Sequence, residues 1–170
     1  MESAVSAKSK MTCAEIGLLL GVIAAHICDE SVFLTFDTEL YTPAVSSRGS
    51  ILGQARGIPV QGGGTDMGLP FQYLIQNKII ADRIIVLSDN QVNAGYRNPI
   101  QGLADSYRRA ANADCWVHGV DLQGYGTQQF IGARTNIITG WSEKILGFIM
   151  LAEEGLDGLT KRIETYEYAA

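Results

Sequence analysis

The stretch ADRIIVLSDN, residues 81–90, decides the fold of this chain. Its apolar run at 83–87 is bounded by turn-forming residues. A run without polar alternation is typical of a strand that is buried on both faces of a parallel sheet. Asp89 follows the run after Ser88, at the carboxyl end of the expected strand. The stretch therefore predicts a parallel sheet with an acidic side chain at its carboxyl edge.

The segments around this stretch alternate between helical and strand patterns. Apolar residues recur at helical spacing over 6–29, and SVFLTF at 31–36 is rich in β-branched and aromatic residues typical of a strand. Further along we expect an edge strand within 40–45, helices at 50–56, 67–78 and 100–111, strands at 114–120 and 136–139, and a helix from 141 to about 154.

This alternation predicts an α/β, Rossmann-like fold: a doubly wound, mostly parallel sheet with helices on both faces. No repeat, low-complexity tract or linker is visible in the 170 residues. We therefore expect residues 1–170 to form a single domain.

The composition excludes several classes of protein. Hydrophobic residues make up 46% of the chain, which is enough for a core and argues against intrinsic disorder. The formal net charge is -5, whereas a free-standing nucleic-acid binder usually carries a basic face. His26 and His118 each lie in an apolar run, so we interpret them as core or boundary residues rather than as ligands or bases.

The cysteines and one apolar run bear on location. Cys13, Cys28 and Cys115 show no metal-ligand spacing, so we interpret them as buried or free thiols in a reducing compartment. The apolar run at 16–28 is too short to span a bilayer, which needs about 20 residues. We therefore expect a cytoplasmic protein that does not engage a membrane.

Two polar loops should meet at the carboxyl edge of the sheet, where ligands of doubly wound folds bind. One is GGGTD at 62–66 and the other is SDN at 88–90. Hydroxyl and carboxylate oxygens suit a hard cation such as Mg²⁺, whereas a helix N-terminus would favour an anion. The simpler interpretation is that Thr65 and Asp66 cap a helix and that Asp89 ends a strand.

A family resemblance becomes specific at these two loops. Residues 62–75 (GGGTDMGLPFQYLI) and 81–95 (ADRIIVLSDNQVNAG) resemble the von Willebrand factor A-type (vWA) domain of the Ro/TROVE ribonucleoprotein family. Residues 32–42 are similar to its second strand and edge hairpin, 115–124 to its fifth strand, and 140–149 to its final helix. The similarity thus covers nearly the whole chain.

The resemblance implies a metal-ion-dependent adhesion site. Thr65 would bind Mg²⁺ through its hydroxyl, Asp89 would lie near the metal directly or through water, and Asp66 would lie behind the ligands or cap the helix. A carboxylate from a partner protein would take the open coordination position. In the family, RNA is bound mainly by a separate helical ring, so we expect RNA to be a partner only indirectly.

One element of the family has no counterpart in the sequence. The family's first, central strand ends in an Asp-x-Ser-x-Ser motif, which does not occur here, and residues 1–4 correspond to the start of the helix that follows it. We therefore expect an N-terminally truncated domain with a partial metal site, and weak or absent Mg²⁺ binding in the isolated chain. Because the family's strand order is 3-2-1-4-5-6, the strands at 31–36 and 83–88 would face each other with open edges.

Three functions follow from these features. The first is a non-enzymatic protein-interaction domain that binds a partner through the metal-site face or the open sheet edge. The second is a self-assembling structural protein in which strand exchange between copies fills the missing strand position. The third is a Mg²⁺-dependent phosphoryl-transfer enzyme using Asp37, Asp66 and Asp89, which no P-loop or nucleophile-elbow motif supports. We favour the first and expect no enzymatic activity.

Overall fold

The computed structural model describes residues 11–60, 62–89, 100–124, 130, 132–155, 158, 160, 164 and 165. Five helices and five strands lie within these residues. In chain order they are α1 (Cys13–Ile27), β1 (Thr35–Phe36), β2 (Leu40–Tyr41), α2 (Ile51–Gly57), α3 (Gly68–Gln76), β3 (Arg83–Ser88), α4 (Ile100–Ala110), β4 (Trp116–Asp121), β5 (Thr135–Thr139) and α5 (Ile145–Glu153).

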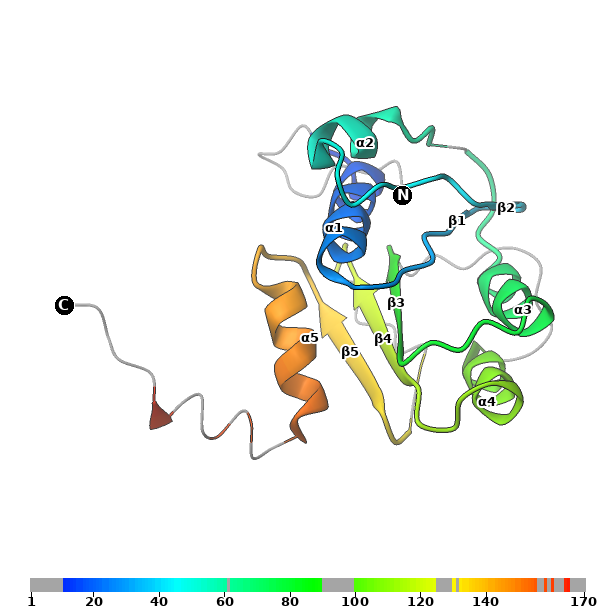
Figure 1. Cartoon of the computed structure of the whole chain (residues 1–170), viewed down its shortest axis with the longest axis vertical. Coiled ribbons are helices and arrows are strands. Elements are labelled where there is room, and N and C mark those ends of the chain that lie inside the picture. The colour runs from blue at the N-terminus through cyan, green and yellow to red at the C-terminus, as the bar shows by residue number, and fades with distance from the viewer. Residues whose placement is uncertain are drawn as a thin grey trace.

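The strands form two separate sheets. β3, β4 and β5 make a three-stranded parallel sheet with β4 in the centre, in which Ile85 pairs with His118 and His118 with Asn136. β1 and β2 make an antiparallel hairpin, which Figure 1 shows set apart from the larger sheet. The α/β class and the parallel sheet are confirmed, and in the described part of the chain the sheet is interrupted between β1 and β3.

Helices cover both faces of the three-stranded sheet (Figure 1). On one face, buried residues of α1 and α5 pack with Val120 of β4 and with Leu122 just after this strand; they are Cys13, Ile16, Leu20 and Ile145. On the other face, α3 and α4 pack against Val117; their buried residues are Phe71, Leu74, Leu103, Ala104 and Tyr107. Val117 and Val120 thus face opposite layers, as the alternation of side chains along a strand requires.

β3 is less buried than its apolar sequence predicts. Its burial was expected to be complete on both faces, but Ile84 to Leu87 are only partly buried and Ser88 alone is buried. The reason is its position, because β3 has β4 on one side and no hydrogen-bonded strand on the other within the described residues. An edge strand keeps one flank accessible even when helices cover both faces.

The hydrogen bonds of β3 identify which backbone groups face the open edge. The N–H of Leu122 donates to the carbonyl of Ser88 at 2.8 Å, so Ser88 faces β4. Backbone groups alternate sides along a strand, so Val86 also faces β4. The N–H and C=O groups of Ile85 and Leu87 therefore point to the open edge, and no backbone hydrogen bond from the described residues reaches them.

The strand expected at 31–36 is wrong for most of its length. Only β1, its last two residues, forms a ladder, and the edge strand expected within 40–45 shrinks to β2. The side chains of the unladdered part still pack, since Phe33 lies against Gly21 of α1. Residues 31–34 lack a ladder because the neighbouring position, between them and β3, holds no described strand.

The predicted helices are confirmed, with α2 shifted by one residue and the others shorter at one or both ends. α1 begins at a capping box in which Thr12 and Glu15 bond each other's backbone N–H groups. α5 begins later than expected: the predicted cap, Ser142, accepts the N–H of Lys144 at 3.2 Å, and the helix starts at Ile145. The expected parts of these helices before residue 11, and most of the segment after 155, lie outside the described residues.

Two further expectations concern the thiols and the membrane. All three cysteines are free, and Cys13 and Cys115 are buried. His118 is fully buried, as expected of a core histidine, while His26 is partly buried. None of the helices in the described ranges is long and apolar enough to cross a membrane.

Candidate functional site

The loop before α3 is tied to the end of β1. Asp37 follows β1 directly and is almost fully buried. Its carbonyl accepts the N–H of Asp66 at 2.8 Å, and its Oδ1 accepts the N–H of Glu39 at 2.7 Å. A Cβ added to Gly63 would lie 3.9 Å from Asp37 Oδ2, so the glycine loop passes close to this carboxylate. These contacts hold the GGGTD loop at the carboxyl end of β1.

Asp66 fixes the start of α3. Its Oδ1 accepts the N–H of Gly68, in the first turn of the helix, at 2.8 Å. Met67 occupies the N-cap position and makes no side-chain cap bond. Asp66 therefore serves as a capping group, as the sequence suggested, and Thr65 beside it is partly buried. A cap of this kind is worth about 1 kcal/mol.

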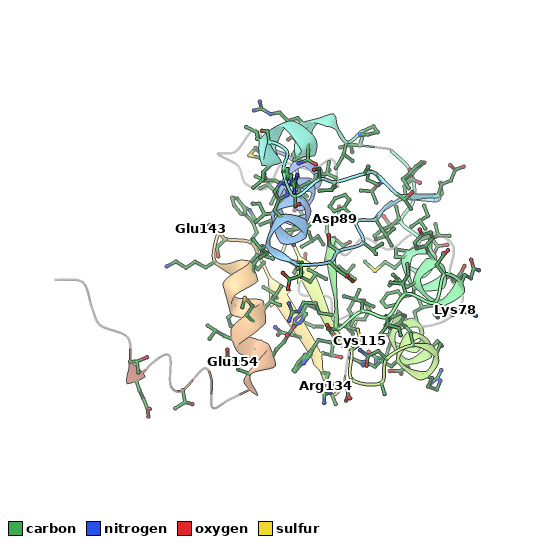
Figure 2. The ribbon with its side chains drawn as sticks, in the orientation of Figure 1. Lys78, Asp89, Cys115, Arg134, Glu143 and Glu154 are labelled. Atoms are coloured by element: carbon green, nitrogen blue, oxygen red, sulfur yellow. The ribbon has the colours of Figure 1, made fainter. Side chains whose placement is uncertain are left out.

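Two further aspartates end neighbouring strands of the parallel sheet. Asp89 follows β3 and Asp121 ends β4, and each is 1% exposed. Figure 2 shows Asp89 at one end of the sheet, beside α1, and Cys115 and Arg134 at the other end. Oδ1 of Asp121 accepts the N–H groups of the two residues at 123 and 124, at 3.1 and 3.0 Å, which shapes the turn after β4.

Cys13 joins these aspartates at the same edge. Its Sγ accepts a hydrogen bond from Gln123 Nε2 at 3.1 Å. Burial raises the pKa of the Cys13 thiol, the Gln123 bond opposes this, and the charges of Asp89 and Asp121 raise it further. The thiol therefore keeps its proton at neutral pH, and both aspartates lie close enough to act on it electrostatically.

The sequence pattern predicts Asp89 at this edge, but Asp121 and Cys13 also lie there and were not predicted. The signal for Asp121 was present, because it ends the apolar run 116–120 just as Asp89 ends 83–88. Cys13 gave no such signal, since its position depends on how α1 crosses the sheet.

The donor set limits the metal that these loops can hold. Oδ1 of Asp37 and Oδ1 of Asp66 each accept a backbone N–H. Within the described ranges, no group of three or more His, Cys, Asp or Glu side chains could hold a metal ion. Thr65 and Asp89 remain the predicted ligands, and Mg²⁺ in proteins is often held by one or two carboxylates with several waters. The chemistry fits a hydrated Mg²⁺ rather than a cation enclosed by protein ligands.

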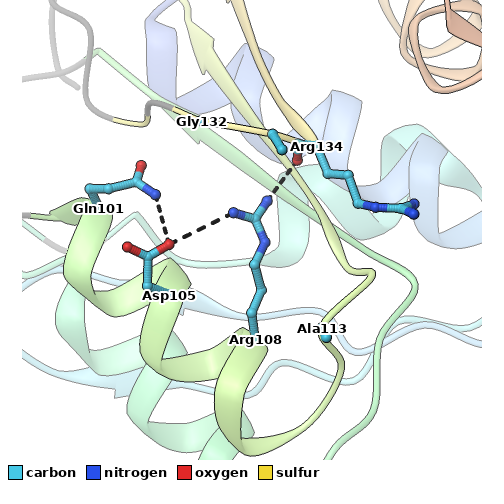
Figure 3. A pocket seen from close by; sticks show the side chains of 7 residues that line it. Gln101, Asp105, Arg108, Ala113, Gly132 and Arg134 are labelled. Atoms are coloured by element: carbon cyan, nitrogen blue, oxygen red, sulfur yellow. Dashed lines mark hydrogen bonds and ion pairs between the residues drawn. The ribbon is translucent and has the colours of Figure 1, made fainter.

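A hollow of about 500 Å³ lies at the opposite end of the sheet (Figure 3). Arg108 of α4 lines it and donates from Nε to the Cys115 carbonyl at 3.0 Å and from Nη2 to the Arg134 carbonyl at 2.7 Å. The Arg134 side chain pairs with Asp114 at 2.9 Å. Both guanidinium groups thus hold loops in place, and we assign no ligand to this hollow.

Comparison with known proteins bears on the fold and the family of this chain. The crystal structure of the Deinococcus radiodurans Ro (Rsr) protein superposes with a TM-score of 0.73 at 17% identity, over 90% of this chain and 31% of that one. This similarity shows the fold, and the chain spans less than a third of that protein. No curated protein sequence matches the chain. The family model of the Ro60 vWA domain matches residues 1–120, well over half of the sequence. The chain therefore belongs to the Ro60 vWA domain family.

Proposed function

We propose that this chain is a non-enzymatic protein-interaction domain that acts through the carboxyl edge of its sheet. The supporting observation is that the Asp37–Asp66 hydrogen bond joins two loops at one strand end, while Asp89 and Asp121 end neighbouring strands. The chemistry favours binding over catalysis. Asp37 and Asp66 accept backbone N–H groups, and the pKa of Cys13 is raised, which leaves no activated nucleophile among them.

In this proposal Thr65 and Asp89 are the protein ligands of a partial Mg²⁺ site, with Asp66 behind them. Two ligands hold Mg²⁺ weakly, so the ion would bind together with a carboxylate from a protein partner. The net charge of -5 supports a role for RNA only through such a partner. The three free thiols fit a cytoplasmic location, where disulfides are rare.

A Mg²⁺ titration followed by amide NMR tests this proposal. We expect shifts around residues 62–66 and 88–89 that saturate only in the millimolar range. Asp89→Ala should abolish them, and Asp114→Ala should leave them unchanged, because Asp114 is an exposed acid at the other end of the sheet. Micromolar binding would contradict a partial site. The absence of any shift at these loops would remove the metal from the proposal.

A second candidate is self-assembly through the open edge of β3. The observation that favours it is the row of backbone groups at Ile85 and Leu87, which point away from β4. Unpaired edges of this kind recruit strands from other chains. A strand donated by another copy would pair there and link the copies into oligomers.

Light scattering over a range of concentrations tests this candidate with one variant and its control. Ile85→Pro removes the N–H that faces the open edge but leaves the ladder to β4 intact, because proline is tolerated at such edge positions. We expect the wild type and Ile85→Ala to associate as concentration rises, and Ile85→Pro to remain monomeric. Ile85→Ala controls for the lost side chain, which packs against the α1 layer. A wild type that stays monomeric at high concentration would exclude this candidate.

A further inference from the structure

A polar network fastens the C-terminal end of α5 to the sheet, away from the carboxyl-edge site. Glu153, the last residue of α5, accepts two hydrogen bonds from Arg83 of β3, from Nε at 2.9 Å and from Nη2 at 2.8 Å. Its Oε1 also accepts a hydrogen bond from Nε2 of His118 in β4 at 2.9 Å. One carboxylate thus joins a helix to two strands.

His118 is enclosed on every side that the structure describes. The ring is 0% exposed, and Trp116 stacks on it with centroids 5.7 Å apart and planes 12° apart. Its Nδ1 is buried without a hydrogen-bond partner in the described structure. Asn136, its cross-strand neighbour on β5, likewise has a buried Nδ2 without a partner. His118 therefore has one satisfied nitrogen and one unsatisfied nitrogen.

This geometry favours the neutral ring. Nε2 carries the proton that it donates to Glu153, and Nδ1 keeps a lone pair. A proton added at Nδ1 would place an N–H donor and a positive charge where the described residues offer it no hydrogen-bond partner. Burial accordingly lowers the pKa of His118, Glu153 opposes this, and the charge of Arg83 lowers it further.

Neighbouring charged groups and burial also act on Arg83 and on the nearby thiol of Cys115. Glu153 raises the pKa of Arg83, burial opposes this, and Cys28 and Asp82 raise it further, so Arg83 stays charged. Burial raises the pKa of Cys115 to about 11, so this neighbouring thiol stays neutral. Of the three side chains in the network, an exposed imidazole alone has an ordinary pKa near neutral pH, so His118 is the group whose proton uptake accompanies release of α5.

We propose that Arg83, Glu153 and His118 form a proton-operated latch that holds α5 on the sheet at neutral pH and loosens as the pH falls below about 6.5. α5 is suited to release because it buries only Ile145 and Ile149, while Phe148 and Met150 are 42% and 55% exposed. When α5 leaves the sheet, it uncovers the apolar layer around Val120, next to the carboxyl-edge site.

The sign of the effect follows from where the proton binds. The released state, with an exposed histidine, takes up a proton near pH 6.5, whereas the docked state resists it. The equilibrium constant for docking α5 is therefore largest above that pH. It falls with the pH by at most about tenfold per pH unit for one proton.

Hydrogen exchange of the full chain at pH 7.5 and 5.5, corrected for the intrinsic pH dependence of exchange, tests the latch. We expect the protection of α5 amides to fall by up to about tenfold, the limit for one proton taken up over roughly one pH unit. α4 should remain unchanged as the internal reference. His118→Gln, which cannot titrate, should remove the pH response of α5. His26→Gln should retain it, because His26 lies on α1 and bonds to backbone carbonyls there and in the 46–50 loop.

Glu153→Gln keeps the test decisive if the His118 variant does not fold. This change removes the charge that Arg83 holds, so α5 protection should already be reduced at pH 7.5 and should fall further at pH 5.5. An α5 that is equally protected at both pH values in the wild type would overturn the proposal. A pH response that persists in His118→Gln, or full α5 protection in Glu153→Gln, would overturn it as well.

Discussion

The molecule has a hairpin half, around β1 and β2, and a laddered half, around β3, β4 and β5. The two halves contain similar strand-like sequences but form different structures. SVFLTF at 31–36 and RIIVLS at 83–88 are both apolar and rich in β-branched or aromatic residues. All six residues of the second segment pair with β4, whereas the first forms a ladder over two residues only. The comparison teaches that β-propensity marks a segment as a strand candidate, and that a hydrogen-bonded neighbour makes it a strand.

The largest expected difference between the halves is in core energetics. Phe71→Ala should destabilise the protein by about 3–5 kcal/mol, because Phe71 is 2% exposed in the layer that α3 and α4 form on the sheet. Phe33→Ala, in the half without a continuous ladder, should cost no more than about half of that value. Urea unfolding of both variants measures the difference. Equal losses would mean that the two halves are equally well packed.

A smaller loss of stability is expected from a change just before β3, where the chain enters the laddered half. The hydroxyl of Tyr107 donates to the Ile79 carbonyl at 2.9 Å and accepts the N–H of Ala81 at 2.8 Å, just before β3. Tyr107→Phe leaves both groups unsatisfied and should cost about 1–3 kcal/mol. Tyr73→Phe, on the partly buried flank of α3, is the matched control and should change stability by less than about 0.5 kcal/mol. A neutral Tyr107→Phe would show that the segment before β3 is not fixed by this side chain.

The smallest effect is expected in the hairpin half. Asp37→Ala removes the acceptor of the Glu39 N–H and should cost about 0.5–1.5 kcal/mol. Exchange should rise at β1 and β2 while β4 keeps its protection, because the hairpin belongs to a separate sheet. Equal loss of protection in β4 would show that the two sheets unfold as one unit.

Much of the fold could be predicted from the sequence because its signals are local. The apolar run at 83–88 and the alternation of patterns gave the parallel sheet with helices on both faces. The missing first-strand motif predicts an interruption between 31–36 and 83–88, and in the described part of the chain β1 and β3 lie in separate sheets. The loss of the ladder at 31–34 was not predicted, since the strand propensity of this segment does not say whether a neighbour is there to pair with it. The late start of α5 at Ile145 was also missed, because Ser142 caps a turn instead of the helix.

For the candidate site as well, some residues could be predicted from the sequence and others could not. The resemblance named Thr65 and Asp89, whose role as metal ligands stays a prediction, and the structure shows Asp66 capping α3. Strand-end position would have found Asp121 as well. The network of His118 and Glu153 carried no sequence signal, because the two residues are 35 positions apart and meet only when α5 folds back on the sheet.

Residue-resolved amide exchange along β3 most directly tests the central claim, that β3 has no hydrogen-bonded strand opposite β4 among the described residues. The N–H groups of Ile84 and Val86 face β4, and those of Ile85 and Leu87 face away from it. The account predicts alternation: Ile84 and Val86 exchange slowly, and Ile85 and Leu87 exchange at least about tenfold faster in dilute solution, because exposed edge amides open without unfolding the sheet. Equal, strong protection at all four positions would contradict the account, because it would mean that another strand already pairs with β3.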